Sequence, residues 1–266
     1  MVVRRATCRC RRVLIALGLS VLTTLAALPA LAQSAPTLTD AWIETLQGRS
    51  APPAWSHAFA LRQETAAELP GQRRRMIEEL RTLIASATIA GDMSRTTGLL
   101  TWQARLEAMD DARGRTPGRM DLPWLGAHLR HNPPLSTIAG WGVCEVPGWV
   151  ELWHVTGVTR LAWRPGLTLD EALQALPEAA RRDSNHAQLI TPPGEVHRLG
   201  IAAWNAEPAP LAPGSRVMLE FPAGQGLRGA LPFPGTVEER QLVNTRLPAY
   251  LATRLPGDDC RLWRAE

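Results

Sequence analysis

The chain has 266 residues, a formal net charge of +4 at pH 7 and no lysine, so every basic residue apart from histidine is an arginine. Five of these arginines lie within the first 12 residues, and no acidic residue precedes Asp40. The rest of the chain is close to neutral, which excludes a general electrostatic attraction to nucleic acid. No apolar run after residue 32 approaches the roughly 20 residues that a membrane-spanning helix requires.

Residues 1–32 have the pattern of a secretory signal peptide. A basic start is followed by an apolar run over residues 13–31, and the segment ends in Ala-Leu-Ala. Cleavage after Ala32 would leave 234 residues with a net charge of −1. We expect the mature protein in a bacterial periplasm. Its two cysteines, Cys144 and Cys260, are expected to form one disulfide there, because that compartment is oxidising.

Two amphipathic patterns predict a helical hairpin in the first half of the chain. Residues 72–87 place their apolar side chains on one helical face, and Pro70 is expected to mark the start of that helix. Residues 94–111 repeat the pattern after a short link, so the two helices should run antiparallel. Arg115, at the exit of the second helix, is expected to be solvated.

After residue 140 the chain shows short strand patterns around one short helix. Thr168 or Asp170 can cap that helix, which should end near Leu176. Strands are expected at residues 149–156, 158–163, 188–191, 196–204 and 216–221. The order of hairpin, helix, hairpin and strand predicts an α+β fold with a mixed sheet. A linker is expected at residues 222–235, and the helical spacing after it predicts a C-terminal helix that Pro248 should kink or split.

The motifs of common catalytic sites are absent from the sequence. There is no G-x-S-x-G, H-E-x-x-H, C-x-x-C or phosphate-binding glycine-rich loop. The pair His128 and His131 has no third ligand nearby, which favours structural or surface histidines over a metal site. The adjacent acids at 110–111 and 238–239 are typical of solvated helix ends. We therefore expect no enzymatic activity, no metal and no cofactor.

One arginine and three tryptophans are the candidate ligand-binding residues. Arg119 presents a planar fork of donors that suits a carboxylate or phosphate, although a structural salt bridge, for instance to Asp111 or Asp121, is the slightly favoured alternative. Trp124, Trp141 and Trp149 lie in segments expected to be loops between domains. Their rings could stack on sugars there or fill a core. The core alternative is favoured for three further tryptophans expected in strands, namely Trp153, Trp163 and Trp204.

Short motifs spread along the chain carry a family resemblance. Residues 155–158 (Val-Thr-Gly-Val) and 164–173 (Arg-Pro-Gly-Leu-Thr-Leu-Asp-Glu-Ala-Leu) are similar to a soluble-ligand-binding β-grasp domain of polysaccharide-export proteins. Further motifs are Leu38-Thr39-Asp40, Pro53-Ala54-Trp55, Gly118-Arg119-Met120-Asp121, Asn132-Pro133-Pro134, Ala202-Ala203-Trp204-Asn205, Pro213-Gly214-Ser215, Val243-Asn244 and Arg254-Leu255-Pro256. In this order and spacing, the chain resembles the capsule biosynthesis GfcC-like family of periplasmic proteins.

The resemblance implies two β-grasp-like domains, at residues 33–140 and 141–226. The first would carry the helical hairpin as an insertion at about 68–112. Because little chain precedes Leu38, its opening strands are expected to be missing or reduced. Residues 227–266 would form a linker and a C-terminal helical tail. The resemblance also places Gly118 and Arg119 at a pocket between the insertion and the sheet.

The function implied by the resemblance is a non-enzymatic accessory role in assembling or exporting capsule or exopolysaccharide. The expected partners are a polysaccharide or the proteins of an export complex, with no nucleic acid and no membrane span in the mature chain. Two other classes remain open: a periplasmic enzyme that modifies or hydrolyses polysaccharide, and a purely structural partner of the export complex.

Overall fold

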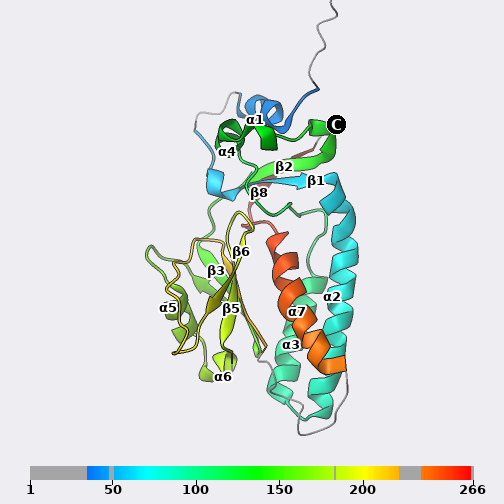
Figure 1. Ribbon diagram of the computed structural model, residues 1–266, viewed down its shortest axis with the longest axis vertical. Helices are drawn as coiled ribbons and strands as arrows, with labels where there is room; N and C mark the ends of the chain where they lie inside the picture. Colours follow the sequence, from blue (N-terminus) through cyan, green and yellow to red (C-terminus); the bar gives the residue numbers. More distant parts are fainter. Residues whose placement is uncertain (1–34, 48–50, 183, 222–234, 265–266) are drawn as a thin grey trace, which may run out of the picture. The chain divides into compact units, whose positions relative to one another are not determined.

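The computed structural model describes residues 35–47, 51–182, 184–221 and 235–264 (Figure 1). The predicted signal peptide and almost all of the predicted linker lie outside these residues. The described residues form two β-sheets and several helices, which confirms the α+β class. None of the described helices is long and apolar enough to cross a membrane.

The first sheet has three antiparallel strands in the order β1-β2-β8. Its strands are β1 (Ala58–Arg62), β2 (Ile138–Cys144) and β8 (Cys260–Arg264). Helices α1 (Leu38–Leu46) and α4 (Leu122–Ala127) lie over the sheet on the side away from α2, α3 and α7 (Figure 1). Single 3₁₀ turns occur at η1 (Trp55–His57), η2 (Leu129–His131) and η3 (Leu135–Thr137). The layer between α1, α4 and the sheet is an apolar cluster that includes the fully buried Trp42.

The predicted helical hairpin follows β1 directly. It consists of α2 (Gln63–Ile89) and α3 (Met93–Glu107), and the side chain of Asp92 caps the second helix through the Arg95 amide. The expectation that Pro70 marks the start of the first helix is wrong, because α2 continues through it. A proline removes only one backbone donor. The apolar contacts of the turn around it, with Leu69 completely buried, offset that loss.

The second sheet has five strands in the order β4-β3-β7-β5-β6, and only the central β3–β7 pair is parallel. Its strands are β3 (Trp149–His154), β4 (Gly157–Ala162), β5 (His186–Ile190), β6 (Val196–Gly200) and β7 (Arg216–Leu219). Helices α5 (Leu169–Gln174) and α6 (Glu178–Arg181) cover one face. Thr168 and Glu171 form a capping box at α5, as the sequence pattern allowed.

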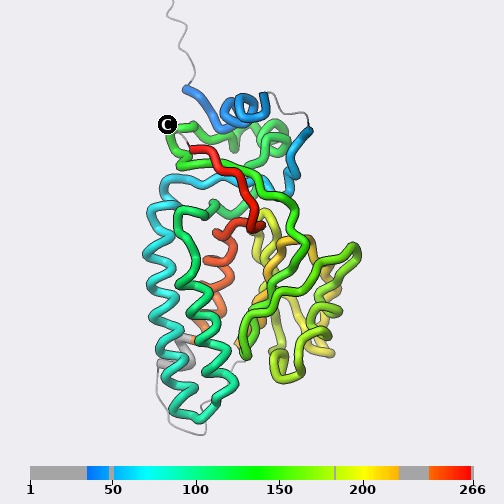
Figure 2. Tube along the Cα trace, turned by 180° about the vertical axis from the view of Figure 1, so that it is seen from behind, coloured from blue at the N-terminus to red at the C-terminus, as the bar shows by residue number. Residues whose placement is uncertain are grey.

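Helix α7 (Gly235–Ala252) packs beside α2, and α7 and α3 lie against the other face of the second sheet, with α2 on their far side (Figure 2). Pro248 does not split this helix, which runs continuously through it, and a kink at Pro248 stays a prediction. Val243, Leu247 and Leu251 are completely buried on the same face. Burial of this apolar stripe stabilises the helix on both sides of the proline.

Strand β8 is absent from the expected elements, where only a helical tail follows the linker. It pairs with β2, and this pairing places Cys144 opposite Cys260. A disulfide joins the two cysteines, with a sulfur–sulfur distance of 2.06 Å. The C-terminal segment is therefore covalently attached to the first sheet rather than only packed against the second.

Candidate functional site

Arg119 lies just before α4, and the salt bridge to Asp121 that was its favoured alternative is confirmed. Its Nε and Nη2 atoms donate to the two carboxylate oxygens of Asp121 at 2.8 and 2.9 Å. The Asp121 side chain is 3% exposed, whereas that of Arg119 is 45% exposed. The hydrogen bonds to Asp121 raise the pKa of Arg119, so the guanidinium is firmly charged. The pair holds the guanidinium in one orientation and leaves about half of the side chain in solvent.

Asp121 also links Arg119 to an aromatic cluster on α4. One carboxylate oxygen accepts the backbone N–H of Trp124 at 3.0 Å, which caps the helix. The ring of His128 stacks on the Trp124 ring with centroids 4.7 Å apart, and the His131 ring lies 5.3 Å away. Trp124 is half-buried, and both histidines are exposed. We call the residues Arg119, Trp124, His128 and His131 the Arg119–Trp124 surface.

The other two candidate tryptophans lie in different surroundings. Trp141 is in β2 and only 8% exposed, and its indole N–H donates to the Thr45 hydroxyl at 2.9 Å. It belongs to the same apolar cluster as Trp124, but as a core residue. None of the three candidates is in a loop, because Trp124 is helical and Trp149 begins β3. The loop placement was therefore wrong for Trp124 and Trp141, whereas Trp149 begins the strand that was expected at residues 149–156.

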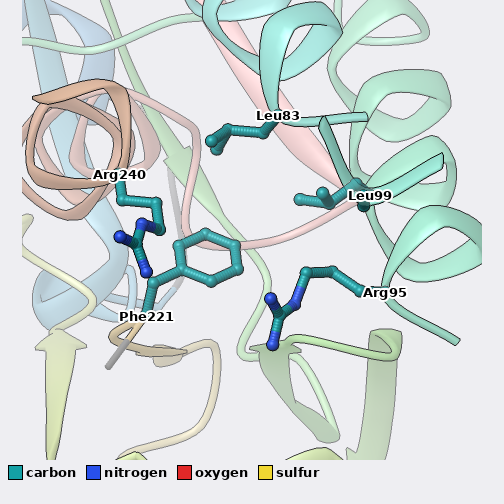
Figure 3. A pocket seen from close by; sticks show the side chains of 6 residues that line it. Leu83, Arg95, Leu99, Phe221 and Arg240 are labelled. Atoms are coloured by element: carbon teal, nitrogen blue, oxygen red, sulfur yellow. The ribbon is translucent and has the colours of Figure 1, made fainter. Parts of the chain in front are cut away.

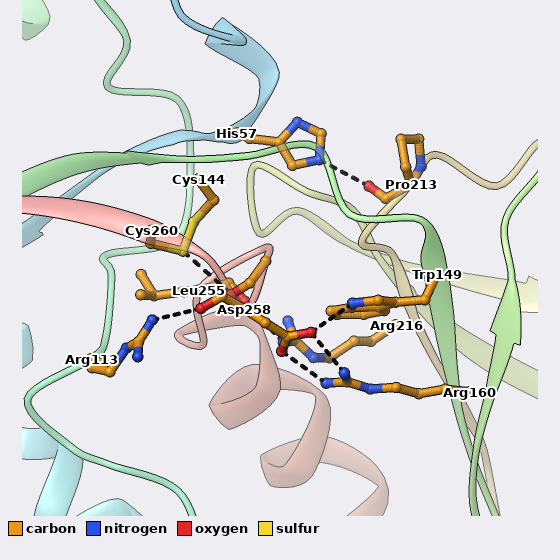
Figure 4. The surroundings of a disulfide bond; sticks show 11 residues. His57, Arg113, Cys144, Trp149, Arg160, Pro213, Arg216, Leu255, Asp258 and Cys260 are labelled. Carbon is orange, nitrogen blue, oxygen red and sulfur yellow. Dashed lines mark hydrogen bonds and ion pairs between the residues drawn. A yellow bond between two sulfur atoms is a disulfide. The ribbon is translucent and has the colours of Figure 1, made fainter.

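Trp149 belongs to a polar cluster near the disulfide (Figure 4). Its indole N–H donates to the Asp258 carboxylate at 2.9 Å. The guanidinium carbons of Arg160 and Arg216 lie 4.1 and 5.5 Å from its ring centre. These cation–π contacts occupy the ring with protein side chains. The structure thus joins Arg119 with Trp124 and places Trp149 in a separate network.

Of the three tryptophans expected in the core, two are buried or partly buried and one is exposed. Trp153 is completely buried, and Trp163 packs partly buried against the second core cluster. Trp204 is 75% exposed and lies beyond the end of β6, so its placement in a strand and a core was wrong. The strand ends four residues earlier, at Gly200, where the chain turns away from the sheet.

Glu151 is a buried charged residue that the sequence patterns did not single out. It is 1% exposed and lies within 2.8 to 3.4 Å of guanidinium nitrogens from Arg160, Arg105 and Arg216. Burial alone would raise its pKa. The charge of Arg216 and the hydrogen bonds from Arg160 and the Trp153 indole outweigh burial and lower the pKa to about 2.

Arg115 contradicts the expectation of a solvated side chain, because it is 1% exposed. Its Nε donates to the backbone carbonyl of Ala252 at 2.8 Å, and its Nη2 donates to that of Thr191 at 3.4 Å. Burial lowers its pKa, and the nearby charges of Arg216 and Arg254 lower it further. Arg115 therefore connects the segment after α3 to the end of α7 and to the β5–β6 turn.

A shallow pocket lies elsewhere, between α2, α3 and the start of α7 (Figure 3). Its volume is about 300 Å³ including its open mouth. Leucine, alanine and phenylalanine side chains form its floor, and the guanidinium groups of Arg95 and Arg240 flank Phe221. None of the predicted site residues lines it. Among the described residues there is also no group of three or more side chains that could hold a metal ion.

The comparison with known families agrees with the resemblance. Residues 157–256 match the family model described as capsule biosynthesis GfcC C-terminal. The matched region runs from β4 through the rest of the second sheet and α7 to Pro256. This family implies involvement in capsule biosynthesis. The match confirms the predicted resemblance: residues 157–256 are similar to the C-terminal region of the GfcC family.

Proposed function

We propose that the protein is a periplasmic, non-enzymatic accessory factor that binds polysaccharide during capsule or exopolysaccharide assembly or export. The observation that carries this proposal is the Arg119–Trp124 surface. A half-exposed arginine, oriented by a buried aspartate, lies on the same short segment as an aromatic stack that is open to solvent. Binding to a protein of the export complex through this surface is the second candidate.

The chemistry of the surface suits an acidic or hydroxyl-rich sugar. The Nη1 amino group of Arg119 takes no part in the pair with Asp121, so its donors are available for a carboxylate or hydroxyl of the glycan. Aromatic rings such as Trp124 and His128 offer apolar faces to the C–H groups of a pyranose. Because the guanidinium is already oriented, little conformational entropy would be lost on binding.

Three features support the location and the domain type in this proposal. The basic and apolar N-terminus is typical of a cleaved signal peptide, and the disulfide suits an oxidising compartment. The second sheet has the order of hairpin, helix, hairpin and strand that the sequence patterns predicted, with the final strand parallel to the first, and this arrangement supports the β-grasp resemblance.

A hydrolase is the less favoured alternative. A glycosidase needs a carboxylic acid that stays protonated long enough to donate to the leaving group, usually through a raised pKa. Glu151, whose pKa is lowered to about 2, is buried among three arginines and is unsuited to that role. The carboxylate of Asp121 is likewise buried and paired with Arg119.

A gene deletion complemented with variants tests the proposal. The variants are Arg119→Ala, Trp124→Ala and, as a matched control, Arg198→Ala. Arg198 is also about half exposed and forms a two-bond pair with a carboxylate, that of Glu220, but it lies on β6. We expect the first two variants to restore less surface polysaccharide than wild type at equal protein level. The control should restore a normal amount.

Two results would contradict the proposal. Normal surface polysaccharide in the deletion strain would remove the role in capsule assembly altogether. Equal restoration by Arg119→Ala, Trp124→Ala and the Arg198→Ala control would keep that role but remove the Arg119–Trp124 surface from it. Immunoblots of the periplasmic fraction are needed in each strain, because a drop in protein level would mimic a loss of function.

A further inference from the structure

Trp204 is the least buried of the tryptophans in the described part of the chain. It is 75% exposed, and no described residue provides a hydrogen-bond partner for its indole or a ring contact. Six other tryptophans donate their indole N–H to a protein acceptor, and Trp55, Trp124 and Trp263 contact other rings. Burial of an aromatic ring is favourable, and an exposed indole leaves apolar ring faces open to a ligand.

The turn that carries Trp204 is extensively hydrogen-bonded. The Asn205 side-chain oxygen accepts the Ala202 N–H at 2.9 Å, and the Asn205 N–H donates back to the Ala202 carbonyl at 2.9 Å. The Asn185 carbonyl accepts both the Ile201 N–H and the Asn205 amide, at 3.0 and 3.2 Å. The exposure of Trp204 is therefore a property of a fixed turn and not of a loose loop.

Two hydrogen bonds between Gly200 and Glu207 also join the ends of this turn. The backbone N–H of Glu207 donates to the Gly200 carbonyl, while one Glu207 carboxylate oxygen accepts the Gly200 N–H, both at 3.1 Å. A Cβ on Gly200 would come within 1.9 Å of the Asn205 carbonyl oxygen, so only glycine fits there. Ile201 packs against the core cluster of the second sheet and anchors the turn from inside.

The polar groups of the turn are mostly uncharged. The Asn185 backbone carbonyl, the Asn205 side-chain amide and the His186 imidazole take part in its hydrogen bonds, and no arginine does. This chemistry suits sugar hydroxyls rather than carboxylates. We propose that the Trp204 turn, residues 201–207, is a second polysaccharide-binding site, where a neutral pyranose unit stacks on the indole. This inference rests on the proposed function, because the polysaccharide is the same.

Equilibrium titration of the secreted full-length protein with the host's purified surface polysaccharide tests the inference. The variants are Trp204→Ala, Arg119→Ala and Met93→Ala. Met93 is the matched apolar control, since it is 67% exposed at the start of α3. We expect Trp204→Ala to weaken binding about tenfold, as loss of one aromatic stack does, with an unchanged melting temperature. Met93→Ala should bind like wild type.

The outcomes separate this inference from the proposed function. If wild type binds and Arg119→Ala weakens binding while Trp204→Ala does not, the Trp204 site is overturned and the proposed function stands. If wild type shows no binding to the polysaccharide, both are overturned. Repeating the titration at high salt tests whether the sugar bound at Trp204 is neutral, because salt screening weakens contacts between charges. A Trp204→Ala effect that disappears at high salt would also overturn the inference.

Discussion

Arg115 and Arg119 are four residues apart in the connection between α3 and α4, yet they occupy opposite environments. Arg115 is 1% exposed and donates to backbone carbonyls, whereas Arg119 is half exposed and paired with a carboxylate. We call one set of buried groups the interior connection: Arg115, Arg216, Glu151 and the disulfide. It joins the two sheets and α7. The Arg119–Trp124 surface faces solvent. An arginine's role here depends on its partners, not on its position after a helix.

The largest expected effect comes from the interior connection. Replacing Arg115 with alanine leaves a large cavity and removes the donors to the Ala252 and Thr191 carbonyls. We expect a loss of about 3 to 5 kcal/mol in the free energy of unfolding, measured by urea denaturation. An Arg115→Met variant, which refills most of the volume, should lose less. A loss below about 1 kcal/mol for Arg115→Ala would contradict the difference between Arg115 and Arg119, because Arg119→Ala is expected to lose no more than that.

The disulfide is the second strongest element of the interior connection. It closes a sequence separation of 116 residues between β2 and β8. Replacing both cysteines with alanine should lower the free energy of unfolding by about 2 to 4 kcal/mol, since the unfolded chain gains freedom. Denaturation of wild type with and without a reducing agent gives an independent value. Equal stability with and without the reductant would show that the covalent link adds nothing to this connection.

The pH dependence of stability tests the buried carboxylate. The pKa of Glu151 is lowered from 4.5 in the unfolded chain to about 2 in the folded protein. A lowered carboxylate pKa stabilises the fold above pH 4.5, and this contribution is lost as the pH falls from 4.5 toward 2. The expected loss in wild type is on the order of 3 kcal/mol. Glu151→Gln should have a flatter profile in this window, and an equally steep one would contradict the assignment.

The pKa of His154 is also lowered, and its effect on stability falls in a higher pH range. Burial lowers its pKa from 6.5 to about 4, so the folded protein keeps this imidazole neutral. Stability from this group is complete above pH 6.5 and decreases as the pH falls toward 4, by up to roughly 3 kcal/mol. The denaturant midpoints of wild type and His154→Gln should differ at pH 6.5 and become more alike as the pH is lowered to 4. Parallel midpoints over the range would exclude the histidine as the cause.

The smallest expected effect is that of the Arg119–Trp124 surface on stability. Arg119→Ala removes a half-exposed ion pair, and Asp121 keeps the Trp124 N–H as a partner. We expect a loss of no more than about 1 kcal/mol, similar to that of Arg198→Ala. Thermal melts of the two variants side by side provide the measurement. A loss several times larger for Arg119→Ala would make Arg119 a structural residue like Arg115.

The sequence was most informative where a local pattern decides the structure. The helix cap at Thr168, the strand pair around Gly157 and the helical hairpin follow from neighbouring residues, and the structure confirms them. Strand β8 and the burial of Arg115 depend on partners more than a hundred residues away in sequence. Pro70 does not start its helix and Pro248 does not split its helix, because tertiary burial of the surrounding apolar face outweighs one lost hydrogen bond.

The same distinction applies to the candidate site. Arg119 and Trp124 are close in sequence, and Asp121 between them supplies the link, so their association could be anticipated. Trp141 and Trp149 were grouped with them because loops were expected there. The pairing of β2 with β8 buries one, and the cluster around Asp258 engages the other. A single sequence contains no local signal for either event.

The most direct test of the account is polysaccharide affinity measured together with stability for Arg119→Ala and Arg198→Ala. Both variants lose a half-exposed arginine and a two-bond carboxylate pair, so their stabilities should be alike. Of these two variants, we expect only Arg119→Ala to weaken polysaccharide binding, by about tenfold, which corresponds to roughly 1.4 kcal/mol. Equal affinities of the two variants for the polysaccharide would contradict the claim that the Arg119–Trp124 surface is the binding site.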